Sequence, residues 1–265
     1  MKKYWALFLK KLRILSSVSI RLRGVHPKHL VEIREFWVKK HLKKTDVVLD
    51  LGCGNGQRDF KIAKFCRKII GIDYDKRNIK IAELYAKKNE VKNVEFINRN
   101  IFSFVGEGLS TLPMGRVEKL SPTRKYDKII LLDVLEHVVE RKKLLSCIHS
   151  LLKNNGQFLL SVPNKNTSWK KFQKEAGVSY FTDPDHKVEY TQAEIVSELQ
   201  RAGFKIIEIK PDVIDTSWAP VFDLIGGFSL EMYKKCLKWK RDQVAIHPEE
   251  ASGWEIVCRK LRIKN

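Results

Sequence analysis

The chain has 265 residues and is 43% hydrophobic, enough to bury one large α/β core with additions. No apolar run reaches the roughly 18 residues needed to span a bilayer, and five scattered cysteines argue against a disulfide framework or a zinc site. The formal net charge of +20 indicates a polyanionic partner, either nucleic acid or an anionic lipid surface, although lysine-rich surfaces also occur in many soluble proteins.

The amino-terminal segment is basic and amphipathic. From Lys2 to Arg23, apolar residues recur at helical spacing with basic residues placed off the stripe. Residues 1–46 contain 13 basic and three acidic side chains, so half of the excess charge lies there. We expect a helix that either packs on its own domain or lies against a membrane interface or an acidic partner. The apolar run Tyr4 to Leu9 is too short for a signal sequence, which predicts a cytoplasmic protein, with peripheral membrane contact as a further option.

A second helix is expected at 28–41, and a buried strand at 47–51 then leads into a glycine-rich turn. Gly52, Gly54 and Gly56 permit positive φ angles and let a ligand approach the backbone closely. The spacing G-x-G-x-G differs from the G-x-G-x-x-G of dinucleotide-binding proteins. The turn therefore predicts a ligand cradle of another kind.

Beyond this turn, strand and helix alternate as in parallel β-α-β units. The predicted helices are 58–66, 76–88, 141–152, one that begins at Thr191 and is closed by Gly203, and a mostly helical stretch from 218 to 240. The predicted strands are 69–72, 94–97, 128–132, 157–162, 205–209 and 254–259. Residues 100–126 and 165–190 are expected to be irregular insertions, because glycine, proline and polar residues interrupt any periodicity there.

The segment Leu-Asp-Leu-Gly-Cys-Gly-Asn-Gly at 49–56 resembles the first motif of class I S-adenosylmethionine-dependent methyltransferases. The segment from Asp133 to His137 resembles the D-x-x-E-H segment of the same family, and the resemblance extends over residues 45–265. It implies a Rossmann-like three-layer α/β sandwich. Its sheet would have seven mostly parallel strands with an antiparallel C-terminal hairpin.

The resemblance implies S-adenosyl-L-methionine as cofactor. Asp73 would accept hydrogen bonds from the ribose hydroxyls, and Asn100 stands where the family usually has an acidic residue near the adenine amino group. The implied cofactor-binding residues are Asp50, Gly52, Gly54, Gly56, Asp73, Tyr74, Asn100, Ile101, Leu132 and Asp133.

A hydroxyl acceptor must lose a proton before it can attack the methyl group. His137 is the first candidate for the general base, since the histidine pKa lies near working pH. Glu136 is the second candidate, or orients the acceptor, and His186 is the third. A histidine at the start of a helix is also often only structural.

If the turn after the fourth strand is helical, Asp133, Glu136 and His137 lie on one side of it, where they could hold a divalent cation. The segment is similar to the E-x-x-E-H metal segment of ubiquinone-pathway and small-RNA terminal methyltransferases. In the latter a later histidine joins the metal, and His186 could be that histidine. The shorter Asp133 in place of the first glutamate puts this metal site in doubt.

Domain organisation is predicted as a basic helical extension, 1–45, and a methyltransferase domain, 46–265, whose insertions near 165–190 and 211–250 form the acceptor pocket. The chain lacks the motifs of base-amine and pyrimidine C5 methylation, which favours O-methylation of a small molecule, lipid-linked intermediate or glycan. RNA 2′-O-methylation is the alternative. A non-catalytic anion-binding module and a nicotinamide-dependent oxidoreductase are disfavoured by the cofactor motifs and the glycine spacing.

Overall fold

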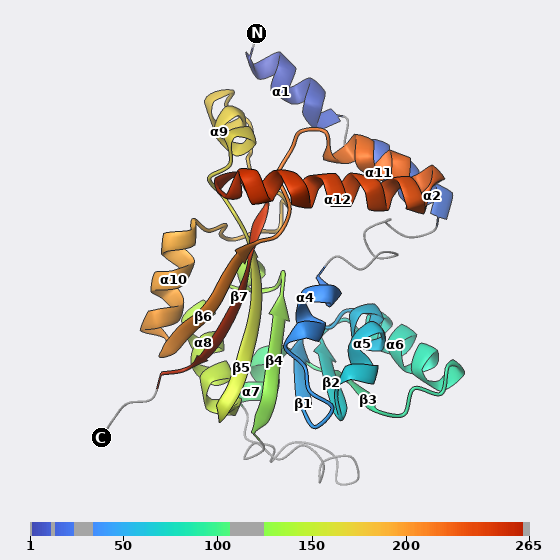
Figure 1. Ribbon diagram of the computed structural model, residues 1–265, viewed down its shortest axis with the longest axis vertical. Helices are drawn as coiled ribbons and strands as arrows, with labels where there is room; N and C mark the ends of the chain where they lie inside the picture. Colours follow the sequence, from blue (N-terminus) through green and yellow to red (C-terminus); the bar gives the residue numbers. More distant parts are fainter. Residues whose placement is uncertain (1, 12–13, 24–33, 107–124, 262–265) are drawn as a thin grey trace. The chain divides into compact units, whose positions relative to one another are not determined.

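A computed structural model describes residues 2–11, 14–23, 34–106 and 125–261 (Figure 1). Within these residues one sheet of seven strands has the order β3-β2-β1-β4-β5-β7-β6. The strands are β1 (Val47–Leu51), β2 (Lys68–Asp73), β3 (Val94–Asn98), β4 (Tyr126–Leu132), β5 (Leu152–Pro163), β6 (Phe204–Pro211) and β7 (Gly253–Lys260). Strand β7 runs against the others, so the predicted Rossmann-like sheet with an antiparallel C-terminal hairpin is confirmed.

The centre of the sheet is buried on both faces. Strand β1 pairs in parallel with β2 and β4, with Leu49 opposite both Ile70 and Ile129. Every residue of β1 is buried, including Asp50. A strand covered on both faces favours a nearly continuous apolar run, as this segment has. The chain reverses its order at β1 and β4, and in such sheets ligands bind at the carboxyl ends of those strands.

Helices cover both faces of this sheet. On one face Trp37 and Val38 of α4 (Glu35–Lys40) and Ile62 of α5 (Gln57–Ile62) share an apolar core with β1 and β4. The helix α6 (Lys76–Lys88) joins the same face through Ile79, which packs with Phe96 of β3. On the other face are α7 (Ile101–Gly106), α8 (Arg141–Leu151) and α10 (Gln192–Arg201). The short 3-10 helices η1 (Ala63–Phe65) and η3 (Leu135–His137) follow α5 and β4.

The chain divides into two compact units, which are described separately. One comprises residues 35–161, 194–209 and 256–265 and contains most of the sheet. The other gathers residues 1–34, 162–193 and 210–255, and we call it the helical unit. Its helices are α1 (Lys2–Lys11), α2 (Ile14–Arg23), α9 (Ser168–Glu175), α11 (Ala219–Phe228), α12 (Leu230–Ile246) and η4 (Pro248–Glu250).

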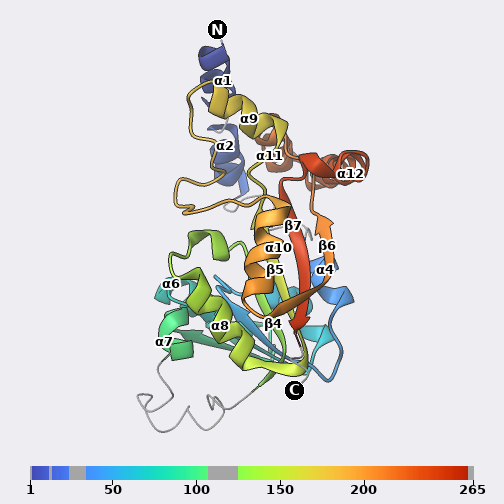
Figure 2. The ribbon, with the colours of Figure 1, turned by 90° about the vertical axis from the view of Figure 1, so that its left-hand side faces the viewer.

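In the helical unit, segments that are far apart in sequence pack together. Helix α2 lies along α11, and Ser16 donates a hydrogen bond of 2.7 Å to Asp223 of that helix. Helix α1 contacts α9, as Figure 2 shows. Thr167 donates to Asp215 at 2.6 Å and so ties the segment 162–193 to the segment 210–255. Residues 1–34 of the predicted extension and the predicted pocket insertions near 165–190 and 211–250 therefore lie in one unit.

The predicted elements agree with the structure at most positions. Two segments predicted to be irregular contain helices: α7 forms within 100–126, and α9 forms within 165–190, with Thr167 as an N-cap that accepts from the Lys170 N–H. Expectations for residues 12–13, 24–33 and 107–124 lie outside the described residues, including the first part of the helix predicted at 28–41 and most of the insertion predicted at 100–126. The domain boundaries at 45 and 46 remain predictions.

Candidate active site

The three loop glycines all have positive φ, but for different reasons. A Cβ on Gly52 would lie 2.5 Å from Val134, and one on Gly56 would lie 2.6 Å from the ring of Phe96. A Cβ on Gly54, where φ is +56°, would meet nothing within 4 Å. Gly52 and Gly56 thus permit close packing, whereas Gly54 faces open space that a ligand can use.

Asp73, at the end of β2, holds this loop. Its Oδ2 accepts from the Gly54 N–H at 2.9 Å and its Oδ1 from the Asp75 N–H at 2.8 Å. A carboxylate has about four acceptor positions, so two remain for a further ligand. The arrangement fits a ribose with two adjacent hydroxyls, which is the role predicted for this residue.

Two buried carboxyl groups lie beneath the loop, on Asp50 of β1 and Asp59 of α5. Both are fully buried, and among the described residues no donor from outside this pair reaches their oxygens. Burial raises the pKa of Asp50, and burial together with the charge of Asp50 raises the pKa of Asp59 well above its ordinary value. Because two adjacent anions are unfavourable here, the raised pKa values favour a pair that shares one proton. One negative charge therefore remains below the loop, which suits a cationic cofactor.

The sequence motifs alone did not indicate a role for Asp59. An acidic residue in the first turn of a helix usually complements the helix dipole at the surface. Its burial depends on Gly71 of β2: a Cβ on that glycine would lie 3.0 Å from Asp59 Oδ2. The available signal was an acidic residue three positions after Gly56, on the side of the helix that must face the sheet.

The other predicted cofactor residues lie at the ends of the strands. Leu132 is buried at the end of β4, and Ile101 begins α7. Asn100 is exposed, and its Oδ1 accepts from the Phe102 N–H at 2.8 Å, so that oxygen already has one donor. Tyr74 is 80% exposed beside Asp73 and offers an aromatic face next to the loop.

Asp133 follows β4 in an unusual conformation. Its φ is +57°, in the left-handed region, so the segment is not helical at this residue. Its N–H and its Oδ1 both bond to the Ser161 hydroxyl, at 3.1 and 3.0 Å. The expectation that Asp133, Glu136 and His137 share one helical turn is therefore wrong. The helical turn η3 starts only at Leu135.

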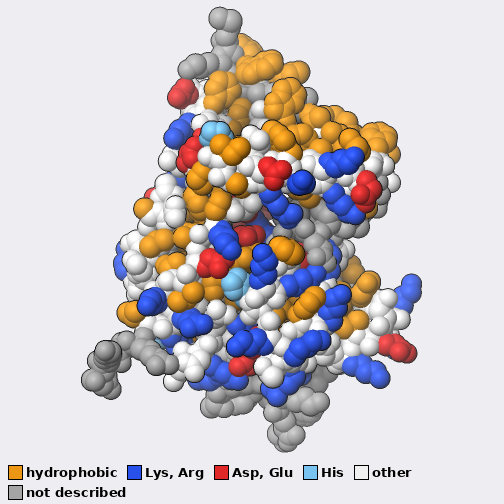
Figure 3. Space-filling model, in the orientation of Figure 1, with side chains coloured by type: hydrophobic (Ala, Val, Ile, Leu, Met, Phe, Trp, Pro, Cys, Tyr) orange, Lys and Arg blue, Asp and Glu red, His pale blue; other side chains and the backbone are white. Residues whose placement is uncertain are grey.

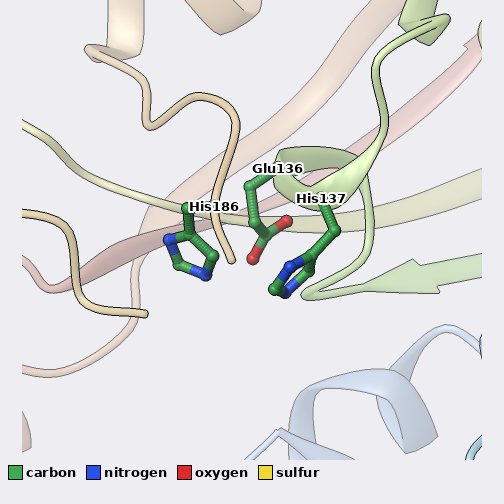
Figure 4. A group of neighbouring side chains, drawn as sticks. All are labelled: Glu136, His137 and His186. Carbon is green, nitrogen blue, oxygen red and sulfur yellow. The ribbon is translucent and has the colours of Figure 1, made fainter. Parts of the chain in front are cut away.

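Glu136 and His137 project from η3 (Figure 4). Glu136 is buried and His137 is exposed, and their possible metal-ligand atoms lie within 4.8 Å of each other. A buried carboxylate beside an exposed imidazole can orient the ring, stabilise its protonated form, or share a cation with it. Figure 4 also labels His186, which belongs to the helical unit.

Within the helical unit His186 belongs to a buried polar network. Its Nδ1 lies 2.8 Å from Oε1 of Glu189, which also accepts from the Thr182 N–H at 2.7 Å, and the Lys170 ammonium pairs with Oε2 of Glu189. Burial acts to raise the pKa of Glu189, but the bond to His186 and the charge of Lys170 outweigh it and lower that pKa. An anionic partner favours the proton on Nδ1, so the neutral ring has its lone pair on Nε2. His186 was predicted from the sequence, whereas its partners Glu189 and Lys170 were not.

Fold and loop together define a class of protein: a Rossmann-like enzyme with a glycine-rich turn after β1 and an acidic residue, Asp73, at the end of β2. The Methyltransferase domain family matches residues 42–203. The chain belongs to the class I S-adenosylmethionine-dependent methyltransferases, as its motifs predict.

Similar proteins agree with this assignment. A ubiquinone biosynthesis O-methyltransferase of Pelagibacter ubique is 29% identical over 135 residues, which cover 50% of this chain and 49% of that protein. The chain thus spans about half the length of the curated relatives it matches. Among solved structures, magnesium protoporphyrin IX methyltransferase of Synechocystis with bound SAH has a TM-score of 0.54 at 18% identity, covering 86% of this chain and 80% of that one. The small RNA methyltransferase HEN1 has a TM-score of 0.58 at 17% identity, covering 88% and 25%. At these identities the structures show the fold alone.

Proposed function

We propose that this enzyme methylates a hydroxyl oxygen of a small molecule, a lipid-linked intermediate or a glycan. The observation that carries the proposal is the Glu136–His137 pair after the carboxyl end of β4, the strand beside β1, from which the cofactor loop starts. Two relatives, 29% and 30% identical to this chain over the matched residues, are named ubiquinone biosynthesis O-methyltransferases, which supports oxygen as the acceptor atom.

The cofactor supplies a methyl group on a positively charged sulfur. In the proposed complex Asp73 binds the ribose, while Asn100, Ile101, Tyr74 and Leu132 border the adenine. The single negative charge shared by Asp50 and Asp59 compensates the cationic methionine end, and Gly54 provides the space that end needs. Asp133, which accepts a hydrogen bond from the Ser161 hydroxyl, would lie beside the methyl donor at the carboxyl end of β4.

His137 is the proposed general base. It is exposed, so an acceptor hydroxyl can reach it, and buried Glu136 would hold the ring and stabilise the imidazolium that forms. Orientation of two bound reactants supplies much of the remaining rate. His186, oriented by Glu189, is the proposed third group, as a second base or an acceptor contact.

A divalent cation could take part in the same reaction. Glu136 and His137 offer one carboxylate oxygen and one imidazole nitrogen, a donor set that suits several divalent metals. The resemblance to the E-x-x-E-H segment predicts His186 as a further ligand. A cation there would lower the pKa of an acceptor hydroxyl. Chelator-sensitive activity restored by a divalent ion would support this, and indifference to chelator would contradict it.

The helical unit is the proposed site of acceptor selection. It combines the segments 162–193 and 210–255, which include both predicted insertions. Segments inserted between strands of the sheet can vary without disturbing the cofactor loop, as is general for loops on a scaffold. Among the described residues, no helix is long and apolar enough to cross a membrane.

RNA 2′-O-methylation is the second candidate, favoured by the +10 net charge of residues 1–46. An RNA substrate would require binding that weakens steeply with salt, because phosphate contacts release counterions. Salt-sensitive RNA binding by the purified protein, followed by transfer to a ribose hydroxyl, would favour RNA over a small acceptor.

The test is a transfer assay with isotope-labelled methyl donor and acceptors that differ only in the receiving group. Phenols, sugars and polyprenyl-linked phenols would be compared with the matching amines. We expect label in the hydroxyl compounds and a large loss of kcat, with little change in KM for the donor, in His137→Gln. Label in the amines, or full activity of His137→Gln, would contradict the proposal.

A further inference from the structure

Helix α1 exposes its aromatic side chains. Tyr4 is 79% exposed, Trp5 is 55% exposed and Phe8 is 52% exposed. Trp5 and Phe8 lie one turn apart and stack at 5.5 Å between ring centroids. Packing of the amino-terminal helix on its own domain would bury these rings. That interpretation therefore does not explain why they are exposed. Exposed apolar residues in such a cluster indicate an interaction site.

Other elements of the helical unit also expose apolar side chains. Helix α2, held along α11 by the Ser16–Asp223 bond, exposes Leu22 by 51% and Ile20 by 40%. Phe228, at the end of α11, is 71% exposed. Figure 3 shows apolar side chains gathered over the helices of this unit.

The charge around these side chains is of one sign. Helices α1 and α2 contain no Asp or Glu, and Lys3, Lys11 and Arg21 are exposed. The first 31 residues contain eight Lys and Arg and no acidic residue. The partner must therefore be apolar and anionic at once.

We propose that α1 lies in the interface of an anionic phospholipid bilayer, with Tyr4, Trp5 and Phe8 between the headgroups and Lys3 and Lys11 on the phosphates. Aromatic rings prefer this depth, and basic side chains flanking them add attraction to anionic lipid. The aliphatic Ile20 and Leu22 favour lipid over RNA, because aliphatic side chains enter acyl chains but do not stack on bases. A second copy of the chain is disfavoured because like-charged helices would meet.

The experiment is flotation of the purified full-length protein with vesicles of phosphatidylcholine, with and without phosphatidylglycerol. We expect binding only to vesicles that contain phosphatidylglycerol, and weaker binding as salt rises. Trp5→Ser combined with Phe8→Ser should weaken binding by about tenfold or more, since each ring would be withdrawn from the interface. Lys3→Ala and Lys11→Ala should each weaken it by roughly fivefold.

The matched control is Ile81→Ser combined with Leu84→Ser on α6, where the side chains are 53% and 58% exposed. This variant loses similar exposed apolar area and should bind vesicles like the wild type. Equal loss in both variants, no vesicle binding by the wild type, RNA binding that Trp5→Ser with Phe8→Ser abolishes, or dimerisation that it abolishes would each overturn the proposal. The readout needs neither cofactor nor methyl transfer, so its failure would leave the proposed reaction untouched.

Discussion

The cofactor loop and the helical unit hold their polar groups in place by different means. At the loop, one short segment contributes Asp50 and three glycines, and the sheet register brings Asp73 beside them. In the helical unit, Lys170 and Glu189 are 19 positions apart and are buried as a charged pair. The loop depends on backbone conformation, whereas the helical unit depends on charge pairing.

This difference separates what each region can tolerate. The loop can be damaged in its ligand affinity while the sheet around it stays folded, because the strands bury a continuous apolar core. A buried ion pair tolerates substitution less well, because removing one partner leaves the charge of the other buried and uncompensated. The following variants test this contrast, from the largest expected effect to the smallest.

Glu189→Ala should reduce the free energy of unfolding by about 3–5 kcal/mol, because it leaves the buried Lys170 ammonium without its carboxylate. The pKa of Glu189 is lowered in the folded protein from 4.5, so its contribution is present above that pH and is lost as the pH falls below it. Denaturant unfolding at several pH values measures both effects.

The control for this variant is Glu231→Ala, which removes an exposed ion pair with Lys234. Exposed pairs contribute little, so its unfolding curve should overlay that of the wild type. If the two variants lose the same stability, or if Glu189→Ala loses as much at low pH as at neutral pH, charge pairing is not what holds this network.

Asp73→Ala should weaken binding of S-adenosylhomocysteine by about 100-fold or more, since two hydrogen bonds to a charged acceptor are lost. The loop also loses its contact to the Gly54 N–H. Asp75→Ala is the matched control: Asp75 caps α6 by accepting from the Arg77 N–H, and its loss should cost about 1 kcal/mol of stability without changing affinity. Calorimetric titration distinguishes them, and equal affinities for the two variants would contradict the assigned role of Asp73.

The sequence was sufficient to predict the loop but not the network. Gly52, Gly54 and Asp73 are recognisable because strand, turn and next strand must follow each other closely, so local pattern and spatial neighbourhood coincide. Lys170 and Glu189 carry no such signal, since a lysine and a glutamate in a polar stretch are normally solvated. Asp133 lies between these cases: the segment was identified, but its left-handed backbone depends on Ser161, which is 28 positions away.

Glu255→Gln in the helical unit should stabilise the protein at high pH. Burial, with the charge of Asp212, outweighs the nearby Arg34 and raises the pKa of Glu255 from 4.5 to about 7. The neutral carboxyl group of Glu255 therefore contributes fully to stability below pH 4.5, and this contribution is lost as the pH rises through about 7. That difference corresponds to roughly 3 kcal/mol, which the neutral glutamine recovers above the raised pKa.

The measurement is again denaturant unfolding across that pH range. Glu255→Gln and wild type should agree at the acidic end and separate at the basic end, whereas Glu249→Gln, at a side chain 68% exposed, should follow the wild type throughout. A constant offset between Glu255→Gln and wild type at all pH values would show a packing effect instead of a titration.

The smallest effects come from one substitution made at two neighbouring glycines. Gly56→Ala places a Cβ 2.6 Å from the Phe96 ring and 3.1 Å from Ala82, so overpacking adds to left-handed strain. We expect a loss of about 2–3 kcal/mol in unfolding free energy.

In Gly54→Ala the added Cβ meets no neighbour, so backbone strain alone should lower the unfolding free energy, by about 1 kcal/mol. Yet its methyl group occupies the space assigned to the cofactor, and affinity for S-adenosylhomocysteine should fall further in Gly54→Ala than in Gly56→Ala. Thermal unfolding and titration of both variants give the comparison. The reverse order of affinities would mean that the open space beside Gly54 is not where the cofactor lies.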